Sequence, residues 1–291
     1  MRGRNGFADL SLMLTVVEAI SLAGDRQKQN DDAFGVTRRR AWVIDGATDL
    51  HDEPLTGSAS DAAWLAQWVS GHLYTHTRDA LLEALRSVSA AARLEFLEKA
   101  GGMPQERWKW PVASIAYLEQ STEGVRGLDL GDCRVVALDA HGAAQSVGAA
   151  QDKAESNAAR AAQQATAGQD EKPLYLRDAA LARLREGRAQ LNQPGARWTF
   201  SLDPACVAHA RPWTLTLERP AHLLMMTDGF AALTDRYGAY DEAGLVRAAL
   251  DKGLHELGRE LRNIETADAD GARHPRFKPS DDATALLLRL T

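Results

Sequence analysis

Short apolar runs and helically spaced apolar residues divide this chain into strands and helices. Runs rich in β-branched and aliphatic residues predict strands over 12–22, 33–36, 41–44, 112–118, 127–130, 134–138, 214–217, 222–227 and 283–290. Apolar residues three and four positions apart predict helices over 58–69, 79–100, 176–191, 241–251 and 254–263. Because the strands occur in runs separated by pairs of helices, the pattern indicates an α+β fold with antiparallel sheets.

The segment 148–197 differs in composition from the rest of the chain. Residues 148–169 are rich in alanine and polar residues and contain few large apolar ones, which predicts a weak helix at the surface. The helix predicted over 176–191 ends before a turn sequence, Asn192-Gln193-Pro194-Gly195. We find no internal repeat and no linker, and therefore expect a single domain over 1–291 with a flap or insert at 148–197.

Composition and charge narrow the classes of function. The 291 residues are 45% hydrophobic and 25% charged, which is typical of a globular domain. The formal net charge is -6 and the pI is near 5.8, which argues against binding to nucleic acid. Arg38, Arg39 and Arg40 form one local basic run, which we interpret as a solvated turn between two strands.

The chain carries no predicted membrane segment. An apolar stretch at 10–23 follows Arg2 and Arg4, but Glu18 interrupts it and it has no small-residue cleavage site, so we interpret it as the first strand. No other segment approaches the roughly 20 apolar residues that would span a bilayer. Cys133 and Cys206 are far apart and lack metal-ligand spacing, which is typical of reduced thiols in a cytoplasmic protein.

Acidic residues gather at the ends of predicted strands. Two strands end in Asp-Gly, and acid pairs precede two others; the acids concerned are Asp31, Asp32, Asp45, Asp228, Asp281 and Asp282. Any one of them alone is commonly a cap or turn residue. If the strands are neighbours, however, their carboxylates converge and repel one another unless a cation neutralises them. Oxygen ligands favour Mg²⁺ or Mn²⁺ over zinc, and the eight histidines show no zinc-site spacing.

Five motifs in this order resemble the metal-dependent protein phosphatases of the 2C type. They are Arg26…Asn30-Asp31-Asp32-Ala33, Val43-Ile44-Asp45-Gly46-Ala47, Leu130-Gly131-Asp132-Cys133-Arg134, Thr227-Asp228-Gly229-Phe230 and Ser280-Asp281-Asp282-Ala283-Thr284. The resemblance extends over nearly the whole chain and is nearest to the compact bacterial branch, which has Asp-Gly-Ala-Thr in place of Asp-Gly-His-Gly. It implies a four-layer αββα sandwich, with two antiparallel β-sheets flanked by helix pairs.

The resemblance also implies a role for each strand-end acid. Asp45 would bridge two Mn²⁺ or Mg²⁺ ions, and the backbone carbonyl of Gly46 would bind one of them. Asp228 and Asp281 would complete the shell of the other ion. A water that bridges the two ions would then attack a phosphoserine or phosphothreonine, and no phosphoenzyme would form.

Three further acids would lie around this metal centre. Asp31 stands at the position of the family's glutamate and would act through a bound water. Asp32 would support the site. Asp132 matches an acid that in bacterial relatives helps to hold a third, weaker metal ion, so the resemblance implies two firmly bound ions and a third bound weakly.

The sequence departs from the family at the basic residue that orients the phosphate. Many members have an arginine five residues before the second acid of the pair, where this chain has Gln27. Arginine binds phosphate bidentately and lysine does not, so Arg26 is the first candidate and Lys28 the second. The alternative is that both are exposed loop charges.

The resulting hypothesis is a monomeric phosphatase that acts on phosphorylated proteins, with no nucleic-acid or membrane partner. A haloacid-dehalogenase-like phosphohydrolase is disfavoured. Such an enzyme needs a second acid two residues after its nucleophilic aspartate, and the residue two positions after Asp45 is Ala47. A catalytically weak, phosphatase-like module that binds phosphoproteins or regulates a partner remains open, because the spacing of Arg26 is unusual.

Overall fold

The strands form two antiparallel sheets in the computed structural model, which describes residues 13–148, 153–166 and 173–291. The first sheet has the order β1 (Leu14–Leu22), β11 (Ala283–Leu290), β10 (Ala221–Met226), β6 (Arg134–Leu138) and β7 (Ala144–Val147). The second has the order β2 (Asp32–Val36), β3 (Arg40–Gly46), β4 (Val112–Ser121), β5 (Gly124–Leu130) and β9 (Arg211–Thr216), and the short β8 (Phe200–Ser201) pairs with β4.

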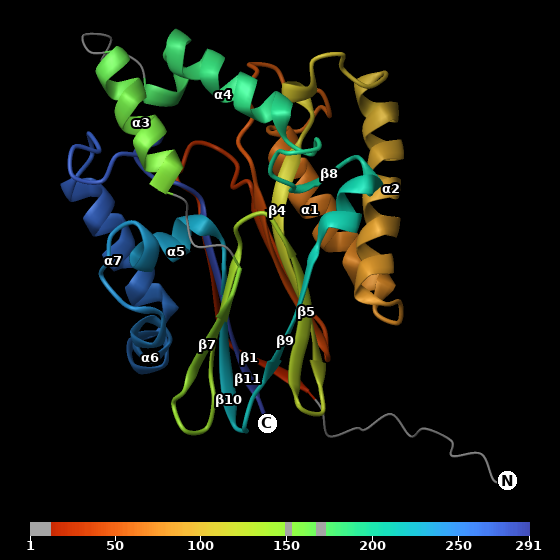
Figure 1. Ribbon diagram of the computed structural model, residues 1–291, viewed down its shortest axis with the longest axis vertical. Helices are drawn as coiled ribbons and strands as arrows, with labels where there is room; N and C mark the ends of the chain where they lie inside the picture. Colours follow the sequence, from red (N-terminus) through yellow and green to blue (C-terminus); the bar gives the residue numbers. More distant parts are fainter. Residues whose placement is uncertain (1–12, 149–152, 167–172) are drawn as a thin grey trace, which may run out of the picture.

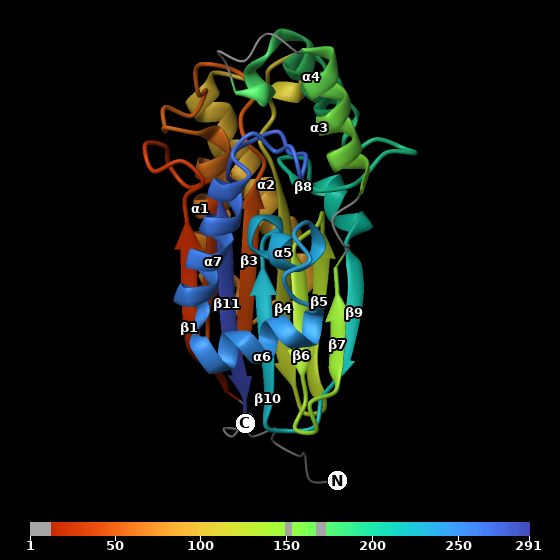
Figure 2. The ribbon, with the colours of Figure 1, turned by 90° about the vertical axis from the view of Figure 1, so that its left-hand side faces the viewer.

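Helices cover the outer faces of both sheets (Figures 1 and 2). Helices α1 (Asp61–Leu73) and α2 (Leu81–Ala100) pack on the second sheet, and α5 (Asp228–Asp235), α6 (Glu242–Lys252) and α7 (Leu254–Ala267) pack on the first. Helices α3 (Lys153–Ala165) and α4 (Asp178–Gln190) lie across one end of the sandwich. Four short 3₁₀ helices lie in the described part of the chain: η1 (Tyr74–His76), η2 (Arg107–Lys109), η3 (Leu174–Leu176) and η4 (Pro204–His209). The predicted α+β sandwich is confirmed.

The central strands of each sheet are buried on both faces, which explains why they are continuously apolar. In β3, Trp42 and Ile44 pack under the helices, whereas Ala41 and Val43 pack between the sheets. Alternate residues of a strand point to opposite faces, so a strand covered on both sides needs apolar side chains at every position. The same division holds along β4, β10 and β11.

Some predicted elements differ from the structure. Helix α5 was not predicted, because its eight residues are too few for a clear helical period and Asp228-Gly229 resembles a turn. Strand β7 was also missed, because its side chains lie at the surface and its sequence is not apolar. Residue 12 of the first predicted strand and part of the helix predicted at 148–169 lie outside the described residues.

The interpretation of the arginine run as a solvated turn is wrong for Arg40. Its side chain is buried at the start of β3 and donates to Glu119 Oε1 at 3.0 Å, to the Tyr117 hydroxyl at 2.9 Å and to the carbonyls of His76 and Asp79. These bonds offset the cost of removing the guanidinium from water. A buried cation gives no signal in the hydrophobic pattern, so the sequence could not distinguish Arg40 from its exposed neighbours.

The two cysteines are free thiols, as the sequence indicated, and both are buried. Burial raises the pKa of Cys206 to about 11, so this thiol stays protonated at neutral pH. Among the residues that the structure describes, no helix combines the length and the apolar character that crossing a membrane requires.

Candidate active site

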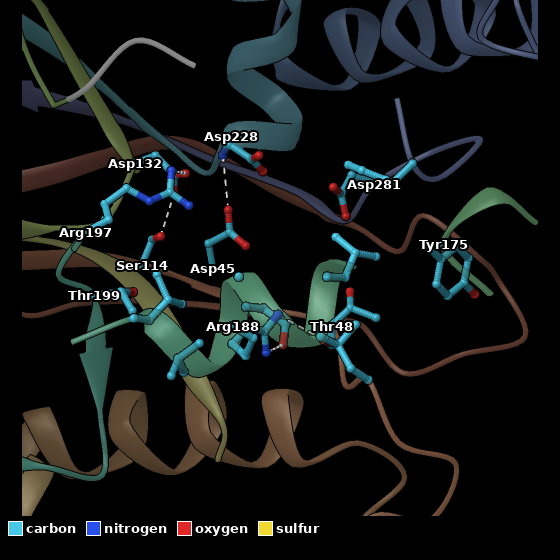
Figure 3. Close-up of a pocket in the computed structure, with 18 of the residues that line it drawn as sticks. Asp45, Thr48, Ser114, Asp132, Tyr175, Arg188, Arg197, Thr199, Asp228 and Asp281 are labelled. Atoms are coloured by element: carbon cyan, nitrogen blue, oxygen red, sulfur yellow. Dashed lines mark hydrogen bonds and ion pairs between the residues drawn. The ribbon is translucent and has the colours of Figure 1, made fainter. Parts of the chain in front are cut away.

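The strand-end acids meet at the end of the sandwich that α3 and α4 cover. Asp45 lies at the end of β3, Asp228 begins α5 directly after β10, and Asp281 precedes β11. All three line one cavity of about 650 Å³ between the sheet ends and the insert (Figure 3). The backbone N–H of Asp228 donates to Asp45 Oδ2 at 3.3 Å. Residues that are far apart in the sequence therefore share one site.

Each Asp-Gly pair needs its glycine, because another segment of the chain passes close to it. A Cβ atom on Gly46 would lie 2.4 Å from the carbonyl oxygen of Asp31, and one on Gly229 would lie 1.9 Å from that of Asp282. The N–H of Gly46 also donates to the Asp31 carbonyl at 3.1 Å. The glycines thus let both strand ends approach the loops that carry the acid pairs.

The carboxylates of Asp45 and Asp32 lie in a buried environment that disfavours their ionised form. They are opposite each other on β3 and β2, and burial, followed by the charge of Asp228, holds the pKa of Asp45 well above its ordinary value. Burial and Asp282 likewise raise the pKa of Asp32. Thr227 Oγ1 donates to Asp32 Oδ2 at 2.8 Å, whereas the buried Oδ1 has no partner among the described residues. Two buried carboxylates this close together are stable only if one of them is protonated or a cation neutralises their charge.

Asp31 and Asp282 hold the first loop against the last strand. The Ser60 hydroxyl donates to Asp31 Oδ1 at 2.6 Å, and burial raises the pKa of Asp31 to about 6 against the opposing effect of this bond. The Asp282 carboxylate accepts the N–H groups of Asp31 at 2.6 Å and of Gly24 at 2.7 Å. The sequence placed Asp282 in a motif but did not predict this positioning role.

Asp132 lies at the opposite side of the cavity from Asp281 (Figure 3). Its Oδ1 accepts the Ser114 hydroxyl at 2.5 Å, and its Oδ2 is 3.7 Å from Arg197 Nη1. Arg197 belongs to the segment that follows α4, so this segment brings a cation to the acid at which a third metal ion was predicted.

Arg26 and Lys28 do not lie where the sequence prediction placed a phosphate ligand. Both side chains are exposed, and neither is among the described residues that line the cavity. The reason is a tight turn, in which Asp25 accepts the N–H of Gln27 through its side chain and that of Lys28 through its carbonyl. Lys28 Nζ donates instead to the hydroxyl of Tyr175, on η3 of the insert, at 2.9 Å.

Helix α4 is held over the cavity by two of its arginine side chains. Arg185 donates to the carbonyl of Leu50 at 2.7 and 2.9 Å and lies over the ring of Trp108 at 4.2 Å. Arg188 donates to the carbonyls of Ala47 and Thr48, each at 3.3 Å (Figure 3). The two arginines are three residues apart and therefore share one helix face. This spacing was the sequence signal for the contact, although its target could not be known.

Lys278 was also missed by the sequence analysis. It lines the cavity, and its Nζ is 2.7 Å from Asp281 Oδ1. Burial pushes the pKa of Asp281 upward, but Lys278 outweighs it and brings this pKa below its ordinary value. Lys278 lies in the irregular loop between α7 and β11, where no periodic pattern indicates its direction.

The donor set of the cavity fits hard divalent cations. Asp45, Asp228 and Asp281 offer oxygen ligands only, and the buried, unpartnered Oδ1 of Asp32 beside them marks a need for positive charge. The raised pKa of Asp45 has the same origin, because carboxylates that crowd together favour either protonation or a cation.

A second acidic group, Asp49, His51 and Asp61, lies at the start of α1. Its ligand atoms are within 4.8 Å of one another, which is compatible with an ion. However, the Asp49 oxygens accept the N–H groups of Asp61 and Ala62, and the Asp61 oxygens accept Thr56 and His51. The Asp49 bonds cap the first turn of α1, and the Asp61 bonds hold the preceding loop against it, which is a sufficient structural role for the group.

Comparison with known proteins gives structural matches and no sequence match. No protein-family profile and no curated protein matches the chain. The Mycobacterium tuberculosis serine/threonine phosphatase PstP/Ppp superposes with a TM-score of 0.55 at 15% identity, over 96% of this chain and 99% of that one. The PPM Ser-Thr phosphatase MsPP from Mycobacterium smegmatis, solved with cacodylate, gives 0.53 at 17% identity, over 95% and 100%. The catalytic domain of PstP in complex with two manganese ions gives 0.54 at 15% identity, over 96% and 99%. This chain therefore has the fold of the PPM-type serine/threonine phosphatases.

Proposed function

We propose that this chain is a Mn²⁺- or Mg²⁺-dependent phosphatase that hydrolyses phosphoserine and phosphothreonine in proteins. Residues 1–291 would form one catalytic domain, and 148–197 an insert over its cavity. The observation that carries the proposal is that Asp45, Asp228 and Asp281 line a single cavity. Solved phosphatases with this fold act on serine and threonine phosphates, and one of them holds two manganese ions, which supports the assignment.

The proposed ligands come from the ends of three strands. Asp45 and the carbonyl of Gly46, with Asp228 and Asp281, would hold two cations. When bound, such ions supply a nucleophilic water near neutral pH and neutralise the charge that develops on the phosphoryl oxygens. Three further acids would complete the surroundings: Asp31 through a bound water, Asp32 as a support, and Asp132 as a ligand of a third, weaker ion.

Contacts within the chain keep these groups in place before any substrate arrives. The Thr227 hydroxyl donates to the Asp32 carboxylate, which lies opposite Asp45 in the sheet, and the Asp228 N–H donates to the Asp45 side chain. A site held in this way loses little free energy to reorganisation during the reaction. The cavity of about 650 Å³ is large enough to admit a phosphorylated side chain and adjoining atoms.

Hydrolysis of a phosphothreonine peptide with and without metal tests this function. We expect turnover with Mn²⁺, its loss in EDTA and its return when Mn²⁺ is restored. Asp45→Asn should lower turnover by at least about a hundredfold, because it removes the negative charge that would hold the metal ions. The circular dichroism spectrum of the variant should stay unchanged.

The same assay separates the alternatives. Hydrolysis that survives EDTA would refute a metal mechanism. Cleavage of p-nitrophenyl phosphate but of no phosphopeptide would refute the protein substrate. Binding of the phosphopeptide without turnover would favour the non-catalytic module instead.

A further inference from the structure

Lys278 is the cavity cation that lies nearest to the proposed metal ligands. Its Nζ is 2.7 Å from Asp281 Oδ1, and its side chain is 27% exposed, so the ammonium faces both the carboxylate and the open space. Within the described part of the chain, it is the only lysine that lines the cavity. Asp282 and Asp31 are close enough to add to the negative potential around it.

The backbone on each side of Lys278 is held firmly. The buried Arg276 donates to Asp268 Oδ2 at 2.8 Å and, through Nε, to the carbonyl of Pro279 at 2.9 Å. Phe277 packs against the apolar cluster under α3 and α4, to which Leu174 belongs. Lys278 is therefore fixed at its Cα, whereas its four-carbon stem is free to change the partner of the ammonium.

Five arginines among the described residues also line the cavity, and two of them, Arg276 and Arg188, are held by partners within the chain. Arg276 is committed to Asp268, and Arg188 to two carbonyls of the loop after β3. Arg197 lies next to Asp132, across the cavity from Asp281 (Figure 3). Its side chain is 68% exposed, and its Nη1 is 3.7 Å from the Asp132 carboxylate. Arg26 lies outside the described lining of the cavity. Among the described residues, the first loop therefore contributes no basic side chain to the lining of the cavity.

Resting on the proposed function, we propose that Lys278 is the phosphate-binding cation of this site and that it exchanges Asp281 for a phosphoryl oxygen when divalent cations bind. A divalent cation held by Asp281 would compete with Lys278 for the negative charge of this carboxylate and would repel the ammonium, which lies 2.7 Å from Oδ1. Lys278 then pairs with the phosphoryl group of a substrate bound in the cavity. The ammonium contacts phosphate as a point charge, in keeping with its role elsewhere in phosphate sites.

The inference predicts that Lys278→Met changes the affinities for metal and phosphate in opposite directions. Calorimetric titration of the EDTA-stripped protein with Mn²⁺ should give about two- to fivefold tighter binding, because an ion pair that competes for Asp281 is gone. Titration of the Mn²⁺-loaded protein with inorganic phosphate should give binding weaker by about tenfold or more, because a charge-assisted hydrogen bond is lost. Lys278→Arg should keep phosphate binding.

Lys252→Met is the matched control. Lys252 also forms an ion pair, with Glu260 between α6 and α7, but it is not among the described residues that line the cavity. Its replacement should leave both affinities unchanged. Thermal unfolding of each variant shows that it is folded.

Three results would overturn the inference. Lys278→Met could weaken Mn²⁺ and phosphate binding together, which a purely structural role would produce. It could leave phosphate affinity unchanged. Finally, Arg26→Ala could cause the loss of phosphate affinity that is expected of Lys278→Met. If the wild-type protein binds no Mn²⁺ at all, the proposed function fails with it, whereas intact Mn²⁺ binding with phosphate affinity independent of Lys278 refutes only the role of this lysine.

Discussion

Replacing Asp31 with asparagine should stabilise the metal-free protein above pH 6. Burial raises the pKa of Asp31 from 3.8 to about 6, so between these values the folded protein holds a proton that the unfolded chain has released. The free energy of unfolding therefore falls as pH rises through this window. Each pKa unit corresponds to about 1.4 kcal/mol, so the full cost of ionising Asp31 is about 3 kcal/mol.

Asparagine is neutral at every pH and can still accept the hydrogen bond from Ser60 through its amide oxygen. In EDTA, Asp31→Asn should thus match the wild type at pH 3.5 and exceed it by up to about 3 kcal/mol at pH 7.5. Other buried acids of the site, such as Asp45, add the same pH dependence to both proteins and cancel in the difference. With Mn²⁺ the advantage should shrink, because a nearby cation compensates the carboxylate charge.

Urea unfolding followed by tryptophan fluorescence at several pH values measures this difference. The control is Asp251→Asn, an exposed acid of α6, which should keep the wild-type pH dependence. If Asp31→Asn and the wild type lose stability in parallel from pH 3.5 to 7.5, the burial argument is refuted.

Two further predictions concern buried or partly buried arginine side chains. Arg188→Met removes the hydrogen bonds to the carbonyls of Ala47 and Thr48. It should raise KM for a phosphopeptide severalfold and speed proteolysis of the α4 region. An unchanged cleavage pattern would show that other contacts hold α4 in place. Arg40→Met leaves Glu119 buried with Arg126 as its remaining partner and should lower the free energy of unfolding by about 3 kcal/mol in a urea titration. A loss below about 1 kcal/mol would mean that water replaces the guanidinium.

The fold was accessible from the sequence because both sheets are covered on both faces. Continuous apolar runs such as 41–44 therefore stood out as strands, and the helix pairs between the strand runs indicated antiparallel sheets. The elements that were missed lack this contrast. Helix α5 has only eight residues, and β7 is polar at the rim of its sheet. Their formation depends on tertiary contacts that no local pattern carries.

The candidate site could be predicted only in part. Asp45 and Asp228 end apolar strands, so the sheet itself dictates where their carboxylates lie, and the structure brings both to one cavity. The two basic residues Arg26 and Lys278 are different, because both lie in irregular segments. The direction of Arg26 depends on the turn at Asp25, and that of Lys278 on contacts made by Arg276. Neither can be read from spacing along the chain.

The arginines of α4 bind the loop after β3 through its main-chain carbonyls. Since every residue type carries the same carbonyl, the side chains at 47–50 can vary without weakening this attachment, whereas Arg185 and Arg188 cannot. A displacement of α4 would therefore also move the backbone that follows Gly46. A partner bound to α4 could in this way affect the proposed metal ligands Asp45 and Gly46 without entering the cavity.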